Sequence, residues 1–549
     1  MEKNGYIGLV KSAIENYSDL PALSDFKGNT LTYGEVGQSI YRCHRVFNLL
    51  GIKPGDKIAL IGRNSNNWAL VYLGTVTYGA IVVPILPDFN PSDISHIVNH
   101  SESLLLFSTD QIFDKIDETS MPKLKGIISI NDMSVLVDNN GKVKKAINKA
   151  RDEVKANNSH PVTGKLKFCN PKPDDIMVLS YTSGTSGFSK GVLLPHRSIW
   201  SNVQYARDTF DIVPGERIVS FLPLAHTYGC LFEFLWPFTE GCHITFLSRT
   251  PSPQIITEAF RKVRPHLILS VPLILEIIFK KQILPKLEKS SIKALLKVPL
   301  VNKFIYGKIK NKLSEVFGGE FREIVIGGAP LNKDVELFLR KIGFPITVGY
   351  GMTECGPLIS YAPWDETKQH SAGRIVHRME VRIDSSDPYN TVGEILVKGD
   401  NVMIGYYKNK QATNEILDED GWLHTGDLGL LDKDNFIYIK GRSKNMILGP
   451  SGQNIYPEEI EAVINNKEYV HECLVREVNG KLEALVYPDY EAVDAEKLSD
   501  KDLEKILQNI KKEVNQELPA FMNISKIVLF PEEFEKTPKK SIKRYKYTS

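Results

Sequence analysis

Short apolar runs alternate with amphipathic segments through most of the first 440 residues. Residues 57–61 and 80–84 have the length and composition of buried strands, and residues 67–78 between them have helical periodicity. The same succession of strand, helix and strand recurs over residues 322–326, 333–342 and 346–348. Such alternation predicts an α/β fold in which helices are layered on sheets.

The pattern changes after residue 392. Short β-like pieces, separated by turns at 418–421 and 432–435, continue to residue 439 and predict a β-rich portion. Pro457 and two acids then open a helix, because proline and carboxylates both suit the first turn. Further strands and helices follow, around 473–475, 482–487 and 502–518. We predict a large N-terminal domain of layered α/β subdomains with a β-rich portion, 1–441, and a small α+β C-terminal domain, 442–549.

Length and composition narrow the class of protein. A chain of 549 residues is too long for one compact core, and 42% hydrophobic with 24% charged residues is typical of globular proteins. The 68 basic and 66 acidic residues nearly cancel, so no nucleic-acid partner is expected. The six cysteines have no metal-ligand spacing and indicate free thiols. The N-terminus has no signal-peptide layout and no apolar run is long enough to span a bilayer, so a cytoplasmic location is expected.

Residues 181–190, YTSGTSGFSK, concentrate small and hydroxyl side chains ahead of a lysine. Apolar runs at 176–180 and 191–194 predict a strand on each side. The glycines allow close approach of the backbone, the hydroxyls add donors and Lys190 adds a positive charge, so a polyphosphate is the expected ligand. A flexible Ser/Gly connection is the alternative. A P-loop is disfavoured, because a serine replaces its second glycine and the next element is a strand.

Four further segments place polar groups next to predicted strands. GGAPL (327–331) and GYGMTECG (349–356) each follow a strand, at the sheet edge where open α/β folds bind ligands. HTGDLG is predicted to hold Asp427 in a tight turn, and GRSKNMI places Arg442 and Lys444 near the domain boundary. Taken singly, a carboxylate in a turn is usually a cap and an Arg-x-Lys pair a solvated surface.

Together and in this order, the segments resemble the acyl-adenylate-forming superfamily, most of all its long-chain fatty acid–CoA ligases. The combination of Y-T-S-G-T-S-G-x-x-K, G-Y-G-M-T-E and T-G-D carries the resemblance, which runs from about residue 31 to Arg544. It implies an enzyme that uses ATP and Mg²⁺ to join a carboxylate to AMP and then transfers the acyl group to a thiol, here coenzyme A. It also implies that the C-terminal domain is mobile, with its hinge at Lys444.

The resemblance implies roles for individual residues. Glu354 would hold Mg²⁺ together with the hydroxyl of Thr182, and His226, in FLPLAHTYG, would lie beside the carboxylate of the acid. Asp427 would accept hydrogen bonds from the ribose. The full binding set comprises a phosphate loop (Thr182, Ser183, Gly184, Thr185, Ser186, Gly187, Lys190), adenine and α-phosphate contacts (Gly328, Ala329, Pro330, Tyr350, Gly351, Met352, Thr353), ribose contacts (Asp427, Arg442), the hinge residue Lys444, and Gly452 beside the pantetheine arm.

One position departs from the family pattern. A late lysine, in a pattern like K-T-P-x-x-K-I-x-R, bridges carboxylate and phosphate in the family, whereas KTPKKSIKR (536–544) has Ser541 there. A hydroxyl cannot supply the positive charge. We hypothesise that Lys540, one residue away on a long flexible stem, is the catalytic lysine, with Lys539 as the other candidate. The alternative is a weakened enzyme, or a protein that binds nucleotide or acyl-adenylate with little turnover.

The sequence also bears on the acid substrate, on the acceptor thiol and on contact with a membrane. Residues 227–232 contain no acid to pair with a substrate amine, which disfavours an amino acid, and residues 271–319 resemble the helical insertion of long-chain acyl-CoA synthetases. We therefore expect a fatty acid and CoA as substrates, with acyl carrier protein as the alternative acceptor. Between Lys280 and Lys312, within the basic helical insertion 279–317, ten lysines and one acid interleave with apolar residues. This pattern fits either a solvated face packed on its own domain or peripheral contact with an anionic membrane surface.

Overall fold

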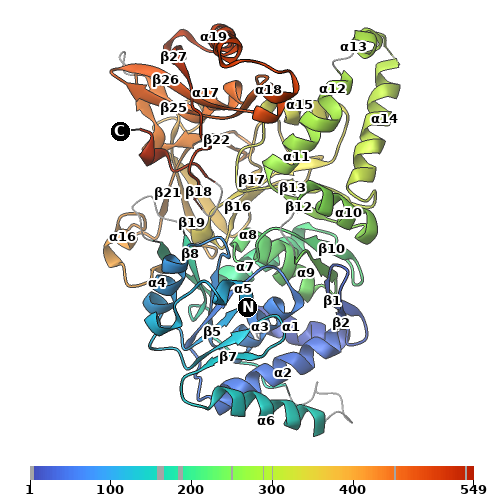
Figure 1. Cartoon of the computed structure of the whole chain (residues 1–549), viewed down its shortest axis with the longest axis vertical. Coiled ribbons are helices and arrows are strands. Elements are labelled where there is room, and N and C mark those ends of the chain that lie inside the picture. Colours follow the sequence, from blue (N-terminus) through green and yellow to red (C-terminus); the bar gives the residue numbers. More distant parts are fainter. Residues whose placement is uncertain are drawn as a thin grey trace.

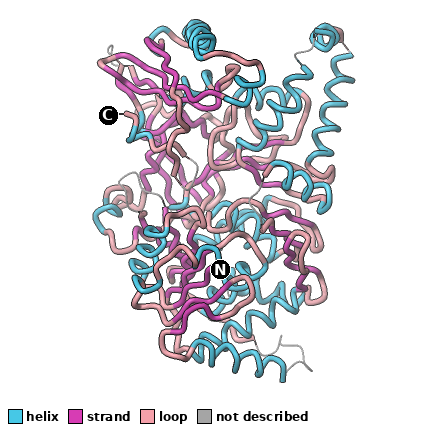
Figure 2. Tube along the Cα trace, viewed as in Figure 1, coloured by secondary structure: helices cyan, strands magenta, loops and turns pink. Residues whose placement is uncertain are grey.

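The computed structural model describes residues 5–156, 166–182, 189–248, 252–287, 290–299, 301–449, 453–537 and 541–548. The first part of the chain lies at one end of the long axis and the C-terminal part at the other (Figure 1). Strands run through the middle of the molecule and helices lie mainly at its periphery (Figure 2). Within the described ranges, no helix combines the length and the apolarity that crossing a bilayer would need.

The largest sheet has eight strands, of which the central five are parallel and the other three antiparallel to their neighbours. Both faces of the central strands are buried, which explains their continuous apolar sequences. In sheet order the strands are β20 (Gly405–Tyr406), β9 (Lys190–Pro195), β8 (Ile176–Thr182), β4 (Ile81–Ile85), β3 (Lys57–Ile61), β5 (Leu105–Ser108), β6 (Gly126–Ser129) and β7 (Val135–Asp138). The strands predicted around the loop 181–190 and near 57–61 and 80–84 are confirmed.

A second layer consists of two short sheets joined by a parallel bridge between Ile218 and Leu267. Their strands are β10 (Arg217–Ser220), β11 (His243–Phe246), β1 (Pro21–Asp25) and β2 (Thr30–Thr32), then β12 (Ile268–Ser270), β13 (Ile324–Ile326) and β14 (Ile346–Val348). One apolar core includes residues of both layers, with the ring of Trp68 6.5 Å from that of Phe234. The predicted strand, helix and strand around 322–348 are confirmed.

Helices flank both layers. They are α1 (Gly5–Asn16), α2 (Tyr33–Leu49), α3 (Asn66–Tyr78), α4 (Pro91–Ser101), α5 (Asp110–Phe113), α6 (Val143–Ala156), α7 (His196–Thr209), α10 (Pro253–Val263), α11 (Pro272–Ile278) and α15 (Lys333–Lys341). Between β10 and β11 lie α8 (Thr227–Gly229), the π-helical η3 (Cys230–Leu235) and α9 (Trp236–Thr239). The basic stretch after α11 is helical as well, with η4 (Phe279–Ile283), α12 (Leu284–Leu287), α13 (Ser290–Leu296) and α14 (Val301–Val316).

The β-rich portion contains an antiparallel sheet of β18 (Met379–Asp384), β19 (Gly393–Gly399), β21 (Leu423–Leu431) and β22 (Ile437–Arg442). A smaller sheet holds β15 (Tyr350–Gly351), β16 (Leu358–Tyr361) and β17 (Arg374–Ile375), and α16 (Lys410–Asn414) interrupts the strands. The tight turn predicted at Asp427 is wrong, because Asp427 lies inside strand β21. Gly426, at φ +70°, instead forms a bulge between two paired parts of the β19–β21 ladder.

The C-terminal part is a small α+β domain with an apolar core of its own. Its sheet is β25 (Val470–Val478), β26 (Lys481–Pro488) and β27 (Ile524–Leu529), and α17 (Pro457–Ile464) and α19 (Asp500–Glu517) pack on it. The domain also contains α18 (Tyr490–Ala495) and the paired strands β23 (Ile447–Leu448) and β24 (Asn454–Ile455). The predicted fold class is thereby confirmed. The boundary at 441/442 and the mobility of this domain stay predictions.

Candidate active site

Glu354 lies in a single 3₁₀ turn, η5 (Thr353–Cys355), directly after β15, and is buried. The hydroxyl of Tyr406 donates to Glu354 Oε1 at 2.8 Å. Lys190 Nζ lies 4.8 Å from the centre of the same tyrosine ring. Strand pairing explains this arrangement, because β20, which carries Tyr406, pairs with β9, which begins at Lys190. Tyr406 thus links the lysine of the 181–190 segment to the carboxylate of GYGMTECG.

The two ends of the predicted phosphate loop are fixed against each other. Thr182 and Lys190 are paired residues in the antiparallel ladder of β8 and β9. The connection between them therefore begins and ends at the same end of these two paired strands. Residues 183–188, with the predicted Ser183, Gly184, Thr185, Ser186 and Gly187, lie outside the described residues.

A second polar group joins Tyr350, Asp427 and Arg442. The Tyr350 hydroxyl donates to Asp427 Oδ2 at 2.7 Å, and Arg442 Nε lies 2.8 Å from Asp427 Oδ1. Only 4% of Asp427 is exposed, and burial raises the pKa of its carboxyl, an effect that Arg442 and Tyr350 oppose. A carboxylate offers about four lone-pair sites, so roughly two remain for further donors. Tyr350 and Arg442 thus each contact one oxygen of the Asp427 carboxylate.

The segment GGAPL follows β13, as predicted, and packs against the segment that carries His226. Gly327 N donates to the carbonyl of Ser270 at 3.0 Å, and the Tyr228 hydroxyl donates to the carbonyl of Val325 at 3.0 Å. A β-carbon on Gly327 would lie 2.9 Å from the Tyr228 ring, so only glycine fits there. Beyond it, the predicted adenine contacts Gly328, Ala329 and Pro330 are exposed.

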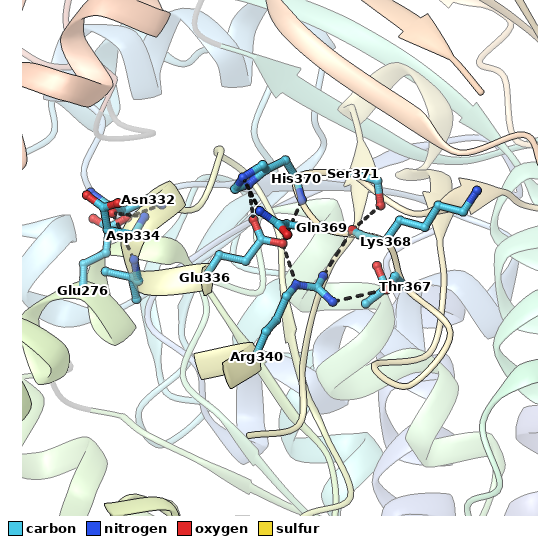
Figure 3. A network of polar contacts seen from close by, with 11 residues as sticks. Glu276, Asn332, Asp334, Glu336, Arg340, Thr367, Lys368, Gln369, His370 and Ser371 are labelled. Atoms are coloured by element: carbon cyan, nitrogen blue, oxygen red, sulfur yellow. Dashed lines mark hydrogen bonds and ion pairs between the residues drawn. The ribbon is translucent and has the colours of Figure 1, made fainter. Parts of the chain in front are cut away.

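The far end of GGAPL is anchored by Asn332, the N-cap of α15 (Figure 3). Its side-chain oxygen accepts from Asp334 N at 3.0 Å, and its backbone N donates to Glu276 Oε1 at 3.0 Å. The Asn332 side chain also donates to Asn466 of the C-terminal domain, whose amide in turn donates to Asp334 at 2.8 Å. The C-terminal domain therefore docks beside this segment.

The next turn of α15 holds a neighbouring loop in place (Figure 3). Glu336, nearly fully buried, accepts from Arg340 Nε at 2.7 Å and lies 3.0 Å from His370 Nδ1. Arg340 also donates to the carbonyls of Thr367 and Lys368 at 3.2 and 3.3 Å. This network fixes α15, and through α15 the end of GGAPL.

His226 is half-buried at the N-terminus of α8, and two buried polar side chains hold the loop that leads to it. Asn64 Nδ2 donates to the carbonyl of Leu222 at 2.8 Å, while Leu224 N donates to Asn64 Oδ1 at 3.0 Å. On the other side, Leu222 N donates to Glu233 Oε2 at 3.1 Å. Glu233 is fully buried, and burial raises its pKa well above the ordinary 4.5. Burial therefore favours the protonated, neutral form of this carboxyl.

The role of Glu233 can be tested with two substitutions. Glu233→Gln is expected to leave activity within about threefold, because an amide oxygen can still accept from Leu222 N. Glu233→Leu is expected to cost about 1–3 kcal/mol of unfolding free energy, since that N–H then loses its partner. It should also raise the KM for the acid without changing that for ATP. Urea unfolding and steady-state kinetics measure both effects.

The protonation of Glu233 adds a pH dependence. The folded protein holds a proton that the unfolded chain releases above about pH 4.5, so this group lowers stability as pH rises from there toward neutrality. Glu233→Gln is expected to show a shallower fall in unfolding free energy over that range. Equal slopes for the two proteins would contradict the buried neutral state.

A small apolar hollow of about 10 Å³ lies beside the His226 segment. Its lining includes Ala225 and Thr227, the neighbours of His226, and continues into the core between the large sheet and η3 with Tyr72, Val178, Leu194 and Leu231. Such a lining favours a hydrocarbon group over a charged or strongly polar one.

The residues near Glu354 fit a magnesium ion that is bound together with a nucleotide. In the described part of the chain, no three His, Cys, Asp or Glu side chains gather as a metal centre. Mg²⁺ usually takes one or two carboxylates and completes its shell with water and substrate phosphates. Glu354, a single buried carboxylate that contacts the same tyrosine as Lys190, suits that mode of binding.

Comparison with known proteins identifies the family. The model of the AMP-binding enzyme family matches residues 10–407, and that of the AMP-binding enzyme C-terminal domain matches residues 444–549. The chain belongs to the AMP-binding enzyme family. It is thus an AMP-forming acid–thiol ligase, which uses ATP to make an acyl-adenylate, and the resemblance inferred from its motifs is confirmed.

Similar proteins include long-chain acyl-CoA synthetases. The chain is 28% identical to peroxisomal long chain acyl-CoA synthetase 7 of Arabidopsis thaliana, over 84% of this chain and 69% of that protein. It is 27% identical to long-chain-fatty-acid–CoA ligase 5 of Rattus norvegicus, over 88% and 77%. Among solved structures, the anthranilate CoA ligase AuaEII in complex with anthranoyl-AMP has the same fold, with a TM-score of 0.80, 18% identity and coverage of 100% and 97%.

The structure brings some of the sequence-predicted residues together. Thr182, Lys190 and Glu354 are linked by strand pairing and Tyr406, and Tyr350, Asp427 and Arg442 form the second group. Thr353 is buried beside Glu354, Met352 is half-buried and Gly351 exposed, and Lys444 is exposed in the turn η6 (Ser443–Asn445). Gly452, Lys539 and Lys540 lie outside the described residues. Sequence reasoning missed Tyr406, Asn64 and Glu233.

Proposed function

We propose that this enzyme is a long-chain fatty acid–CoA ligase, which activates its acid as an acyl-adenylate and transfers the acyl group to coenzyme A. The single observation that carries the proposal is the group of Lys190, Tyr406 and Glu354 beside the 181–190 segment. The apolar hollow beside His226 and the names of the similar proteins favour a fatty acid.

The first half-reaction has to bring two anions together. At about 4 Å and an effective dielectric near 20, a carboxylate and a phosphate repel each other by roughly 4 kcal/mol. In our proposal Lys190 and the loop donors hold the β- and γ-phosphates, and Glu354 with Thr182 holds Mg²⁺. When bound, Mg²⁺ neutralises phosphate charge and polarises the phosphoryl oxygens. Tyr406 keeps the Glu354 carboxylate pointing toward this position.

The nucleoside is proposed to bind between the Asp427–Arg442 pair and the GGAPL segment. The free lone pairs of Asp427 accept the ribose hydroxyls, and the exposed side chain of Arg442 reaches the same sugar. Gly328, Ala329, Pro330 and Tyr350, with Gly351 and Met352, line the adenine slot, and Thr353 lies by the α-phosphate. His226 borders the carboxylate of the acid, and the acyl chain extends toward the apolar hollow.

The second half-reaction is proposed to depend on a swing of the C-terminal domain at Lys444, which brings Gly452 beside the pantetheine arm. The domain is docked through Asn466 on Asn332 and Asp334, through Lys280 Nζ on the carbonyl of Asn465 at 2.9 Å, and through Lys440 Nζ, 3.4 Å from Glu459 Oε1. Polar contacts of this kind are exchangeable with water, as a moving domain requires.

A substrate panel tests the proposed function. Fatty acids of graded length, with aromatic and short acids alongside, are incubated with ATP, Mg²⁺ and either CoA or an acyl carrier protein, and AMP release is measured. Highest kcat/KM with long chains and CoA is expected. Preference for short or aromatic acids would overturn the proposed substrate, and faster transfer to the carrier protein would overturn the proposed acceptor.

The lysine that completes the charge balance is proposed to be Lys540. On either side of this position, Thr537 N donates to the carbonyl of Ser541 at 2.8 Å, and Lys536 forms an antiparallel β-bridge with Ile542. Arg544 anchors this segment to Glu461 of α17.

Lys540→Ala is expected to lower ATP–pyrophosphate exchange by about 10²-fold, because a positive charge at the reacting oxygens is lost. Lys539→Ala is the matched control and should change it less than threefold. Unchanged exchange in Lys540→Ala would eliminate this lysine. Faster exchange in Ser541→Lys than in the wild type would instead show that the natural enzyme is weakened. This is the second candidate function, and it is favoured by Ser541 at the position of the family's lysine.

A further inference from the structure

The helices α12, α13 and α14, residues 284–316, form an arm that extends from the large domain. Helix α13 lies at an extreme of the molecule, and α14 leads back toward α10 (Figure 1). At the base, Leu313 and Val316 are buried. The base is therefore packed on the domain. One side of α14 is packed there as well, with the Tyr306 ring 6.3 Å from that of Phe338 in α15, while other side chains of the arm are exposed.

The lysines of the arm are concentrated in its outer part, where no acid offsets them. Residues 290–312 contain six lysines and no aspartate or glutamate, in a chain whose total formal charge is only +2. Among them Lys297, Lys303, Lys308 and Lys312 are exposed. Such a local concentration of positive charge attracts an extended anionic surface and repels a second copy of the same arm.

Large apolar side chains are exposed among these lysines. Leu295, Val298 and Phe304 are 43%, 47% and 64% exposed. They are three of thirteen exposed large hydrophobic side chains in the described residues, and they fall within ten positions. Lys308 Nζ lies 4.5 Å from the centre of the Phe304 ring, so cationic and apolar groups are interleaved on one surface. Solvation of the lysines alone gives no reason for this apolar exposure.

We propose that the exposed side chains of the arm within residues 295–299 and 301–312 dock on the surface of an anionic lipid bilayer. The lysines contact the phosphates of the headgroups, and Phe304, Leu295 and Val298 enter the boundary of the acyl region. An RNA would also attract the lysines, but aliphatic Leu295 and Val298 offer bases no stacking face. The inference stands independently of the proposed substrate.

Cosedimentation of the full-length protein with vesicles tests the inference. Vesicles of phosphatidylcholine alone are compared with vesicles that contain about 30% phosphatidylglycerol, at low salt and at about 0.5 M salt, where screening is strong. Lys303→Gln with Lys308→Gln is expected to lower affinity about 25-fold, because each lysine near the surface contributes about fivefold. Phe304→Ser is expected to lower it about tenfold.

Matched controls carry the same types of substitution in the C-terminal domain, away from the arm. Lys501→Gln with Lys505→Gln removes two exposed lysines of α19, and Phe521→Ser removes an apolar side chain that is 40% exposed. Both should bind vesicles like the wild type, and AMP release with detergent-dispersed fatty acid should be unchanged in all four variants. Absence of cosedimentation at low salt, equal binding to neutral vesicles, or losses as large in the controls would overturn the proposal. So would arm variants that lose affinity for single-stranded RNA but not for vesicles.

Discussion

Glu354→Gln is expected to reduce ATP–pyrophosphate exchange by about 10²- to 10³-fold, the cost of removing one preorganised electrostatic partner of a transition state. The substitution keeps the size of the side chain and lets the Tyr406 hydroxyl still donate to the remaining carbonyl oxygen. What it removes is the negative charge proposed to hold Mg²⁺. The measurement is exchange as a function of Mg²⁺ concentration, and the half-saturating concentration should rise with the loss of rate.

Tyr406→Phe is the control that separates charge from orientation. It keeps the ring beside Lys190 and removes only the hydroxyl that donates to Glu354. A hydrogen bond to a charged group contributes about 1.5–3 kcal/mol, so exchange should fall about tenfold or somewhat more, with a smaller change in Mg²⁺ dependence. If Glu354→Gln kept the exchange rate and the Mg²⁺ dependence of the wild type, Glu354 would not be the magnesium ligand.

The elements that sequence reasoning predicted well are those whose burial leaves a local pattern. β3, β4 and β8 are apolar on both faces, and α15 opens after its cap residue Asn332. The position of Glu354 and GGAPL at strand ends followed from the same local signals. These predictions needed no knowledge of which strands pair.

The residues that were missed depend on contacts between distant parts of the chain. Tyr406 reaches Glu354 only because β20 pairs with β9, and nothing around GYY indicates that pairing. Asp427 was placed in a turn because Gly-Asp is a turn signal, but β22 pairs with this segment and makes it a strand with a bulge. Glu233 did leave a signal, a lone acid within the apolar run CLFEFL. Its partner, Leu222 N, could not be read from the sequence.

Asp427→Asn is expected to lower kcat/KM for ATP by about a hundredfold or more, because two hydroxyl donors lose a charged acceptor that contributes about 1.5–3 kcal/mol to each bond. The sharper measurement compares ATP with 2′-deoxy-ATP and 3′-deoxy-ATP. The wild type should discriminate against both analogues, and Asp427→Asn should use all three nucleotides almost equally. A variant that merely folded poorly would lose activity on all three by the same factor and keep its discrimination.

Tyr350→Phe is the matched control for Asp427, since it removes the neighbouring hydroxyl and leaves the carboxylate in place. It should lower activity modestly while discrimination among the three nucleotides persists. The pH profile provides an independent measurement. Burial raises the pKa of Asp427, so the acceptor is lost to protonation at a higher pH than for an exposed aspartate, and discrimination should weaken as pH falls. Discrimination that survived in Asp427→Asn would show that another group binds the ribose.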